Sequence, residues 1–240
     1  MLLGRQQMNK LIHETKLVIY ATLRQLPGKL GRRFQHKYMR RYMRQQARTE
    51  FEKAIRRSDG MTCIDLGANI GEYTRKMASG TKQVIAFEPD PWAYAALQIN
   101  VADLDNVKIE NAAAGTSEST VVLYRHPRFE ENPALNSQSS SVIASKSNVN
   151  EEGAIEIQQV DFIRYLEDLN EDIGLLKVDI EGAEVDLLEA LFDRPDILNR
   201  IDHIFAETHE TRILGHEPRV NALRERAKLI KHPYINLYWH

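Results

Sequence analysis

The chain has a single cysteine, Cys63, and therefore cannot form an internal disulfide. Glycine and proline are also sparse, with 12 and 8 residues among 240, which excludes collagen-like and low-complexity structures. The longest uncharged apolar run near the N-terminus, residues 17–23, is far shorter than the roughly 20 residues of a membrane-spanning helix. No signal-peptide cleavage site follows it. These absences predict a soluble, folded protein of the cytoplasm.

Charge is distributed unevenly along the chain, although the formal net charge is only −2. Residues 1–60 contain 15 lysines and arginines against 4 acidic residues, whereas the remaining residues contain 17 against 30. This division predicts a basic helical extension over residues 1–58 and an acidic domain over residues 59–240. Within the extension, Pro27-Gly28 separates two expected helices.

Three interpretations of the basic extension remain open. It packs as a cap over its own domain, it mediates dimerisation, or it makes peripheral contact with an anionic membrane surface. Nucleic acid is not the expected partner, because the larger domain is acidic. No oligomeric state is predicted.

Apolar runs alternate with helical patterns from residue 60 onward. The expected strands cover residues 61–66, 83–88, 107–110, 120–125, 154–160, 175–179, 201–208 and 235–239. The expected helices cover residues 72–78, 91–101, 161–169, 184–192 and 217–230. The alternation predicts an α/β fold with a doubly wound, mostly parallel sheet, whose ligands bind at the carboxyl ends of the strands. The polar residues 132–150 between the β insertions are either a lid that binds a polyol or a mobile surface loop.

The first two strands end in residues suited to a nucleoside ligand. Asp65 precedes the segment Gly67-Ala68-Asn69-Ile70-Gly71, which lacks the three-glycine pattern of dinucleotide-binding loops. S-adenosylmethionine fits this segment better than a dinucleotide, because Asp65 suits its amino group and the backbone amides suit its carboxylate. Glu88, at the end of the second strand, is expected to accept both ribose hydroxyls. Asn111, after the third strand, is expected at the adenine edge.

Acidic residues and a histidine follow two later strands. Asp179 and Glu181 follow one strand, and Glu207 and His209 follow the next. In one mechanism, His209 or an acid takes the proton of an acceptor hydroxyl. In the other, Asp179, Glu207 and His209 hold Mg²⁺, which lowers the pKa of that hydroxyl. The metal-free mechanism is favoured here because no third carboxylate is expected beside the ion.

The segments CIDLGANIGEYT, AFEPD and LLKVDIEGAEVDLL resemble the FkbM-type methyltransferases, which use S-adenosylmethionine. The resemblance covers about residues 60–210 and implies a Rossmann-like class I methyltransferase fold and O-methylation, commonly of sugar or polyketide hydroxyls. It also implies cofactor-binding roles for Asp65, Gly67, Asn69, Gly71 and Glu88. The expected function is therefore O-methyl transfer to a hydroxyl of a carbohydrate or glycoconjugate, such as a glycolipid. The alternatives are a protein that binds the cofactor without catalysis and a nicotinamide-dependent oxidoreductase.

Overall fold

A computed structural model describes residues 12, 15–149 and 152–239. The chain divides into two compact units, one that ends at Glu50 and takes in Tyr238 and Trp239, and one that spans Phe51–Leu237. Helix α2 (Gly28–Arg57) begins in the first unit and ends in the second. The two units thus meet within this helix, whereas the expected boundary between residues 58 and 59 lies just after it.

The first unit contains two helical segments with a turn between them. Residues 15–23 are helical, and α2 begins at Gly28, so the expected break at Pro27-Gly28 is present. Aromatic rings join the two helices, with the ring centroids of Tyr20 and Phe34 5.9 Å apart. Residues 1–11, 13 and 14 of the extension lie outside the described part. No helix among the described residues is long and apolar enough to cross a membrane.

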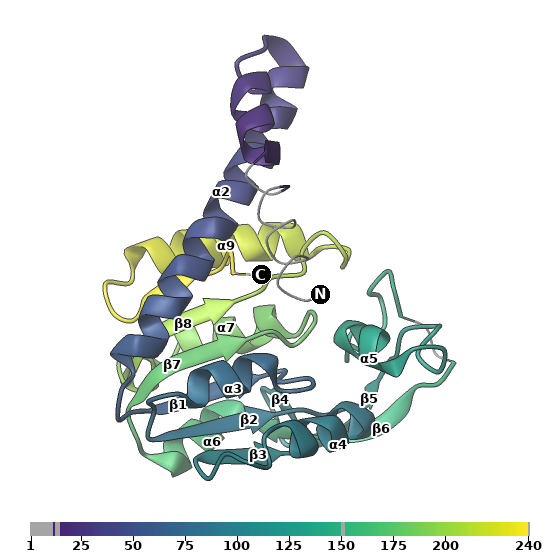
Figure 1. The fold of residues 1–240 in the computed structure, drawn as a ribbon, viewed down its shortest axis with the longest axis vertical. Helices are drawn as coiled ribbons and strands as arrows, with labels where there is room; N and C mark the ends of the chain where they lie inside the picture. Colours follow the sequence, from purple (N-terminus) through teal and green to yellow (C-terminus); the bar gives the residue numbers. More distant parts are fainter. Residues whose placement is uncertain (1–11, 13–14, 150–151, 240) are drawn as a thin grey trace. The chain divides into compact units, whose positions relative to one another are not determined.

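The second unit is built on a parallel sheet with the strand order β3-β2-β1-β7-β8-β9 (Figure 1). Strand β1 lies at the centre of this sheet, β2 and β3 follow on one side of it, and β7, β8 and β9 follow on the other. The strand order therefore reverses between β1 and β7. The expected doubly wound arrangement is therefore confirmed. The strands are β1 (Thr62–Leu66), β2 (Gln83–Phe87), β3 (Val107–Glu110), β7 (Ile173–Val178), β8 (Ile201–Ala206) and β9 (Tyr234–Asn236).

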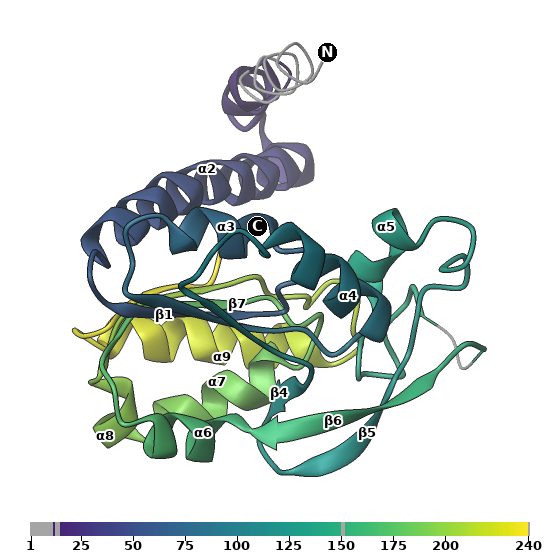
Figure 2. The same ribbon diagram turned by 60° about the horizontal axis from the view of Figure 1, so that its bottom comes forward.

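Helices cover both faces of this sheet (Figure 2). One face carries α3 (Glu72–Ala78) and α4 (Pro91–Asn100), and the other carries α6 (Phe162–Leu169), α7 (Glu184–Phe192), α8 (Pro195–Leu198) and α9 (His216–Leu229). Branched aliphatic side chains of the central strands pack against α7 and α9 to form the main core. Cys63, inside β1, is buried in this second unit, where burial raises the pKa of its thiol to about 11. Because the helices cover the two faces, the carboxyl ends of the strands are left to the loops that follow them.

A smaller sheet has the strand order β4-β6-β5, with β4 (Ala113–Gly115), β5 (Ser119–Leu123) and β6 (Ile155–Asp161). Strand β4 was not expected, because its three small residues lack the β-branched side chains that mark strands. The polar segment between β5 and β6 also contains elements that were not expected, α5 (Pro133–Asn136) and a 3₁₀ turn (Ser137–Ser139). Isolated bridges from Tyr124 to Ser141 and from Lys146 to Ile213 attach this segment to the domain.

Candidate active site

The parallel register brings the residues after five strands to one edge of the central sheet. Leu66 is paired with both Phe87 and Val178, Phe87 with Glu110, and Val178 with Ala206. The residues that follow these pairs are Gly67, Glu88, Asn111, Asp179 and Glu207. The sequence-predicted residues of the site therefore share the edge at which ligands of doubly wound sheets bind.

The turn after β1 requires glycine at position 67. Gly67 has φ 73°, and a Cβ atom on it would lie 1.8 Å from the carbonyl oxygen of Asp179. The amides of Gly67 and Ala68 both donate to the carbonyl oxygen of Phe87, at 3.0 and 2.9 Å. Gly71 has φ 89° and stands at the start of α3, where a Cβ atom would meet the side chain of Leu97. Glycine thus lets the backbones of β1 and β7 approach where the strand order reverses.

Asp65 lies beneath this turn and is fully buried. Its carboxylate accepts hydrogen bonds from Thr74 Oγ1 at 2.7 Å and from Lys177 Nζ at 2.8 Å. The ammonium of Lys177 also donates to the carbonyl oxygen of Gly67 at 3.1 Å. Burial lowers the pKa of Lys177, but the carboxylates of Asp65 and Asp179 outweigh it and raise the pKa. Asp65 holds the turn in place here, and its contact with a cofactor amino group stays a prediction.

Glu88 connects the ends of β1 and β2. Its two carboxylate oxygens accept the backbone amides of Asn69, at 2.7 Å, and Asp90, at 2.9 Å. Burial raises the pKa of Glu88 to about 7. The side-chain amide of Asn111 donates to the carbonyl oxygen of Glu88 at 2.8 Å. Glu88 is therefore fixed in position, while the adenine contact of Asn111 stays a prediction.

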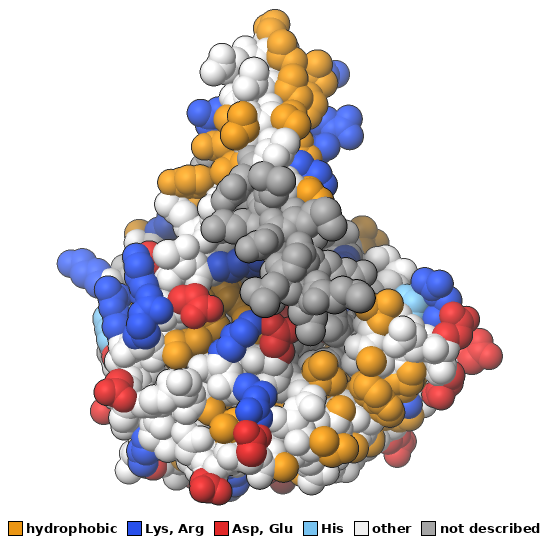
Figure 3. Space-filling view, viewed as in Figure 1, with side chains coloured by type: hydrophobic (Ala, Val, Ile, Leu, Met, Phe, Trp, Pro, Cys, Tyr) orange, Lys and Arg blue, Asp and Glu red, His pale blue; other side chains and the backbone are white. Residues whose placement is uncertain are grey.

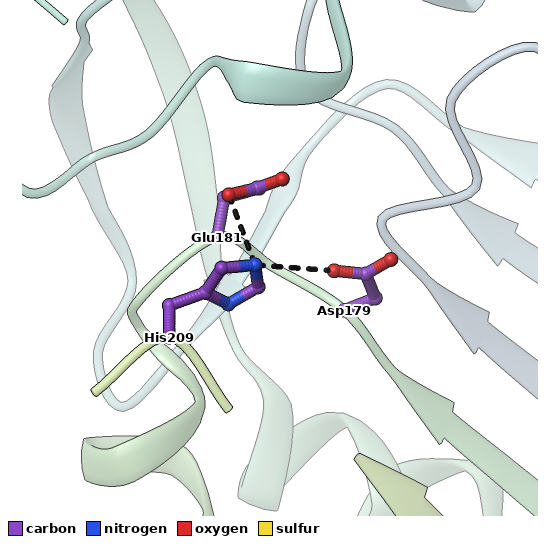
Figure 4. A group of neighbouring side chains, drawn as sticks. All are labelled: Asp179, Glu181 and His209. Carbon is purple, nitrogen blue, oxygen red and sulfur yellow. Dashed lines mark ion pairs between the residues drawn. The ribbon is translucent and has the colours of Figure 1, made fainter. Parts of the chain in front are cut away.

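His209 lies between the carboxylates of Glu184 and Glu181, and Figure 4 shows it with Glu181 and Asp179. Its Nδ1 is 3.0 Å from Glu184 Oε1, and its Nε2 is 3.1 Å from Glu181 Oε2. Glu184 is buried and accepts the amides of Ile180 and Gly182, so it stabilises the turn after β7 and also orients His209. Burial alone lowers the pKa of His209, but Glu184, Glu181 and Asp179 outweigh it and raise the pKa to about 9. His209 is thus an imidazolium at neutral pH, which argues against it as the proton acceptor.

Asp179 faces the same histidine but is not hydrogen-bonded to it. Its Oδ1 lies 4.0 Å from His209 Nε2 and is buried without a hydrogen-bond partner among the described residues. Burial raises the pKa of Asp179 to about 7, against the opposing effect of the Lys177 ammonium. A carboxylate that titrates near neutral pH is well suited to act as a general base. Glu207 lies nearby, with its Oε1 3.9 Å from His209 Nε2.

Three side chains of this cluster meet the geometric requirement for a metal site. One ligand atom each of Asp179, Glu181 and His209 lies within 4.8 Å of the other two. This group has two carboxylates and one histidine, and Glu181 takes the place in it that was expected for Glu207. The contact of Glu181 with His209 is not predictable from the sequence, because Glu181 reaches the cluster through a left-handed backbone, with φ 56°.

The charges around Glu181 nevertheless oppose a metal ion. Its Oε2 already forms ion pairs with His209 and with the ammonium of Lys146, whose side chain is fully buried. A cation bound by Glu181 would lie beside the ammonium of Lys146. The donor set therefore fits a metal-free site better than a magnesium site.

Lys146 belongs to the polar segment and was not among the expected site residues. Its Nζ donates to the carbonyl oxygen of Ser139 at 2.8 Å as well as to Glu181. Ser141 Oγ donates to the carbonyl oxygen of Glu181 at 2.6 Å, and Asn69 Nδ2 donates to Ser137 Oγ at 3.1 Å. The segment thus contacts both the turn after β1 and the acidic cluster. A lone lysine in a polar stretch has no pattern that would predict such a contact.

The family model described as the methyltransferase FkbM domain matches residues 65–225 of the chain. The chain belongs to the FkbM methyltransferase family. The match includes every site residue from Asp65 to His209 and leaves the basic helices outside it. The oxidoreductase alternative is not supported by this membership.

Two relatives and one solved structure show how far the similarity extends. Methyltransferase 1 of Beauveria bassiana (strain ARSEF 2860) is 29% identical over 164 residues, which cover 62% of this chain and 65% of the relative. Methyltransferase sdnD of Sordaria araneosa is 30% identical over 187 residues, which cover 68% and 71%. A crystal structure of methyltransferase FkbM from Methylobacillus flagellatus KT is 19% identical, with a TM-score of 0.36, and covers 57% of this chain and 30% of its own.

Proposed function

We propose that the protein transfers a methyl group from S-adenosylmethionine to a hydroxyl oxygen of a carbohydrate or glycoconjugate. Membership of the FkbM family supports methyl transfer. The observation that carries the proposal is the placement of Glu88 and Asp179 after β2 and β7, on opposite sides of the Gly67 turn of β1. One carboxylate thus lies where a nucleoside binds in such sheets, and the other lies at the point of strand reversal.

The lone pairs of Glu88 fit the ribose diol of the cofactor. A carboxylate offers about four acceptor positions, and the amides of Asn69 and Asp90 take one on each oxygen. The remaining position on each oxygen suits one of two neighbouring hydroxyls. The backbone amides of residues 67–71, expected to bind the cofactor carboxylate, instead donate within the protein, to oxygens of Phe87, Ala68, Asn69 and Glu88. The cofactor would supply a methyl group bound to a sulfonium sulfur. Because this sulfur leaves readily as a thioether, the reaction needs no nucleophilic side chain of the protein.

Asp179 is the residue that we assign as the general base. As the bond between the acceptor oxygen and the methyl carbon forms and the carbon–sulfur bond breaks, the hydroxyl proton would pass to the carboxylate of Asp179. His209 stays protonated between Glu184 and Glu181 and holds Glu181 in place. The hydroxyl and amide side chains of residues 136–141 supply hydrogen-bonding groups suited to a polyol acceptor.

The decisive experiment is calorimetric titration of the folded protein with S-adenosylmethionine and with NAD⁺. We expect saturable binding of the former only, and a Glu88→Gln variant that binds at least tenfold more weakly. The exposed Glu118 provides the matched control, since Glu118→Gln removes the same charge away from the site. Absence of binding to the folded wild type would overturn the proposed cofactor.

A second measurement separates catalysis from binding. The wild type is incubated with labelled S-adenosylmethionine and a panel of glycosides, and the methylated position is located by mass spectrometry. We expect a methyl ether on a sugar hydroxyl. Binding of the cofactor without transfer to any hydroxyl would instead favour the cofactor-binding alternative, and transfer to nitrogen or carbon would overturn the proposed O-methylation.

A further inference from the structure

The N-terminal hairpin, defined here as residues 15–50, combines a large positive charge with exposed aliphatic side chains. We propose that this hairpin docks on the surface of an anionic phospholipid bilayer. The proposal does not depend on the methyl-transfer function, because it concerns residues outside both the site and the family match. It selects one of the three interpretations that the sequence leaves open.

The charge of the hairpin is almost entirely of one sign. Residues 15–50 contain 10 lysines and arginines, and Glu50 is the one acidic residue among them. Two of the cations stack on aromatic rings, with the guanidinium of Arg24 4.1 Å from the ring centroid of Tyr38 and the ammonium of Lys37 5.8 Å from that of Tyr20. Neither contact removes any charge. A surface of this composition is attracted to an anionic bilayer within about one Debye length.

Aliphatic side chains are exposed on both helices of the hairpin and in the turn between them. The exposed fractions are 66% for Val18, 46% for Ile19, 41% for Leu26 and 52% for Leu30. Figure 3 shows hydrophobic side chains gathered along the segment at the top of the view, with Lys and Arg on its flanks. The two helices contact each other through Tyr20 and Phe34 instead. The exposed aliphatic groups are therefore available to enter a lipid interface.

An anionic bilayer accounts for both the positive charge and the exposed aliphatic side chains. Nucleic acid and a second copy of the hairpin each account for only one of these two features. Nucleic acid would neutralise the positive charge but would leave the four aliphatic side chains in water. A second copy of the hairpin could bury the aliphatic side chains but would bring 10 further positive residues against the first 10. Lipid headgroups take the charge while the acyl boundary takes the aliphatic groups.

The test is co-sedimentation of the full-length protein with vesicles. One set contains phosphatidylcholine and phosphatidylglycerol at 3:1, and the other contains phosphatidylcholine alone. We expect binding to the anionic vesicles at low salt, and at least tenfold weaker binding both to the neutral vesicles and in 0.5 M salt. Failure to bind anionic vesicles at low salt would overturn the proposal.

Two double variants of the hairpin, each with a matched control elsewhere in the chain, test whether the hairpin carries the vesicle binding. Val18→Gln with Ile19→Gln tests the aliphatic contribution, and its matched control is Ile99→Gln with Leu229→Gln, on exposed residues of α4 and α9. Lys29→Glu with Arg33→Glu tests the charge, and its matched control is Lys228→Glu with Lys231→Glu. Each hairpin pair should weaken vesicle binding at least fivefold, and each control pair should change it less than twofold. Equal effects of the hairpin and control pairs would overturn the assignment.

Two further measurements distinguish the rival partners. Tight binding of a 30-mer DNA duplex without vesicle binding would replace the bilayer with nucleic acid. A dimer in sedimentation equilibrium that the Val18/Ile19 pair disrupts, again without vesicle binding, would replace the bilayer with a second copy. Titration with S-adenosylmethionine, which we expect to be unchanged in the hairpin variants, separates a failure here from a failure of the proposed function.

Discussion

At the scale of the residue, the proposed chemistry depends on the ionisation of Asp179. Burial raises the pKa of Asp179 to about 7, so this carboxyl is still largely protonated at pH 6. Only the ionised form accepts a proton. We therefore expect kcat for methyl transfer to rise with pH, with an apparent pKa near 7, and to level off near pH 8. The measurement is the pH dependence of kcat at saturating concentrations of both substrates.

The variant Asp179→Asn tests the same assignment. We expect kcat to fall by about 10²- to 10⁴-fold, while the Kd for S-adenosylmethionine changes less than threefold. Asp196→Asn, an exposed substitution on α8, is the matched control and should leave both values unchanged. A wild-type kcat that stays constant between pH 5.5 and 8 would contradict Asp179 as the base.

At the scale of the element, the polar segment is attached to the site through one buried ion pair. Lys146 is the only buried ammonium that the described residues place between this segment and Glu181. Removing one partner of a buried ion pair leaves the other charge unpaired, which costs about 3–5 kcal/mol. His209 and Arg212 still face Glu181 and reduce this loss of stability. In Lys146→Met we therefore expect backbone amides of residues 137–149 to exchange at least tenfold faster.

Hydrogen-exchange mass spectrometry measures this effect segment by segment. Peptides from β1 and β7 should exchange as in the wild type, because their hydrogen bonds lie within the central sheet. Lys231→Met serves as the control for loss of an exposed lysine. If exchange in residues 137–149 does not change, the ion pair does not hold the segment.

The elements also show what the sequence could and could not predict. Strands buried on both faces, such as β7, appear as continuous apolar runs, and so the sheet and its edge were predictable. The register then placed Asp179, Glu207 and His209 together. Strand β4 was not predictable, because Ala113–Gly115 has no strand pattern and pairs only through tertiary contact with β6.

The contacts of Glu181 and Lys146 were beyond sequence reasoning for a similar reason. A left-handed backbone at a non-glycine residue turns Glu181 toward His209, and residues 35 positions apart meet only in the folded chain. Local patterns do not encode either feature. The same limit applies to the ion pair of Asp65 with Lys177, which lies 112 positions away along the chain.

At the scale of the whole molecule, the buried Glu88 and His209 and the half-buried Asp179 make stability depend on pH in the same direction. Glu88 and Asp179 have pKa values raised to about 7 from 4.5 and 3.8, and His209 has one raised to about 9 from 6.5. At a pH between the unfolded and folded pKa of each group, the folded state binds more protons than the unfolded state. The stability from each group is therefore complete below its unfolded pKa and is lost as pH rises through its folded pKa. We expect the free energy of unfolding to fall between pH 5 and 9.

The variant Glu88→Gln isolates one of these contributions, because its amide cannot ionise. A pKa shift from 4.5 to about 7 corresponds to about 3 kcal/mol. The wild type should therefore lose about that much stability relative to Glu88→Gln between pH 4.5 and 8, as measured by urea unfolding. Glu118→Gln, on an exposed residue, should show no such pH-dependent difference from the wild type. A constant difference between the wild type and Glu88→Gln would contradict the raised pKa of Glu88.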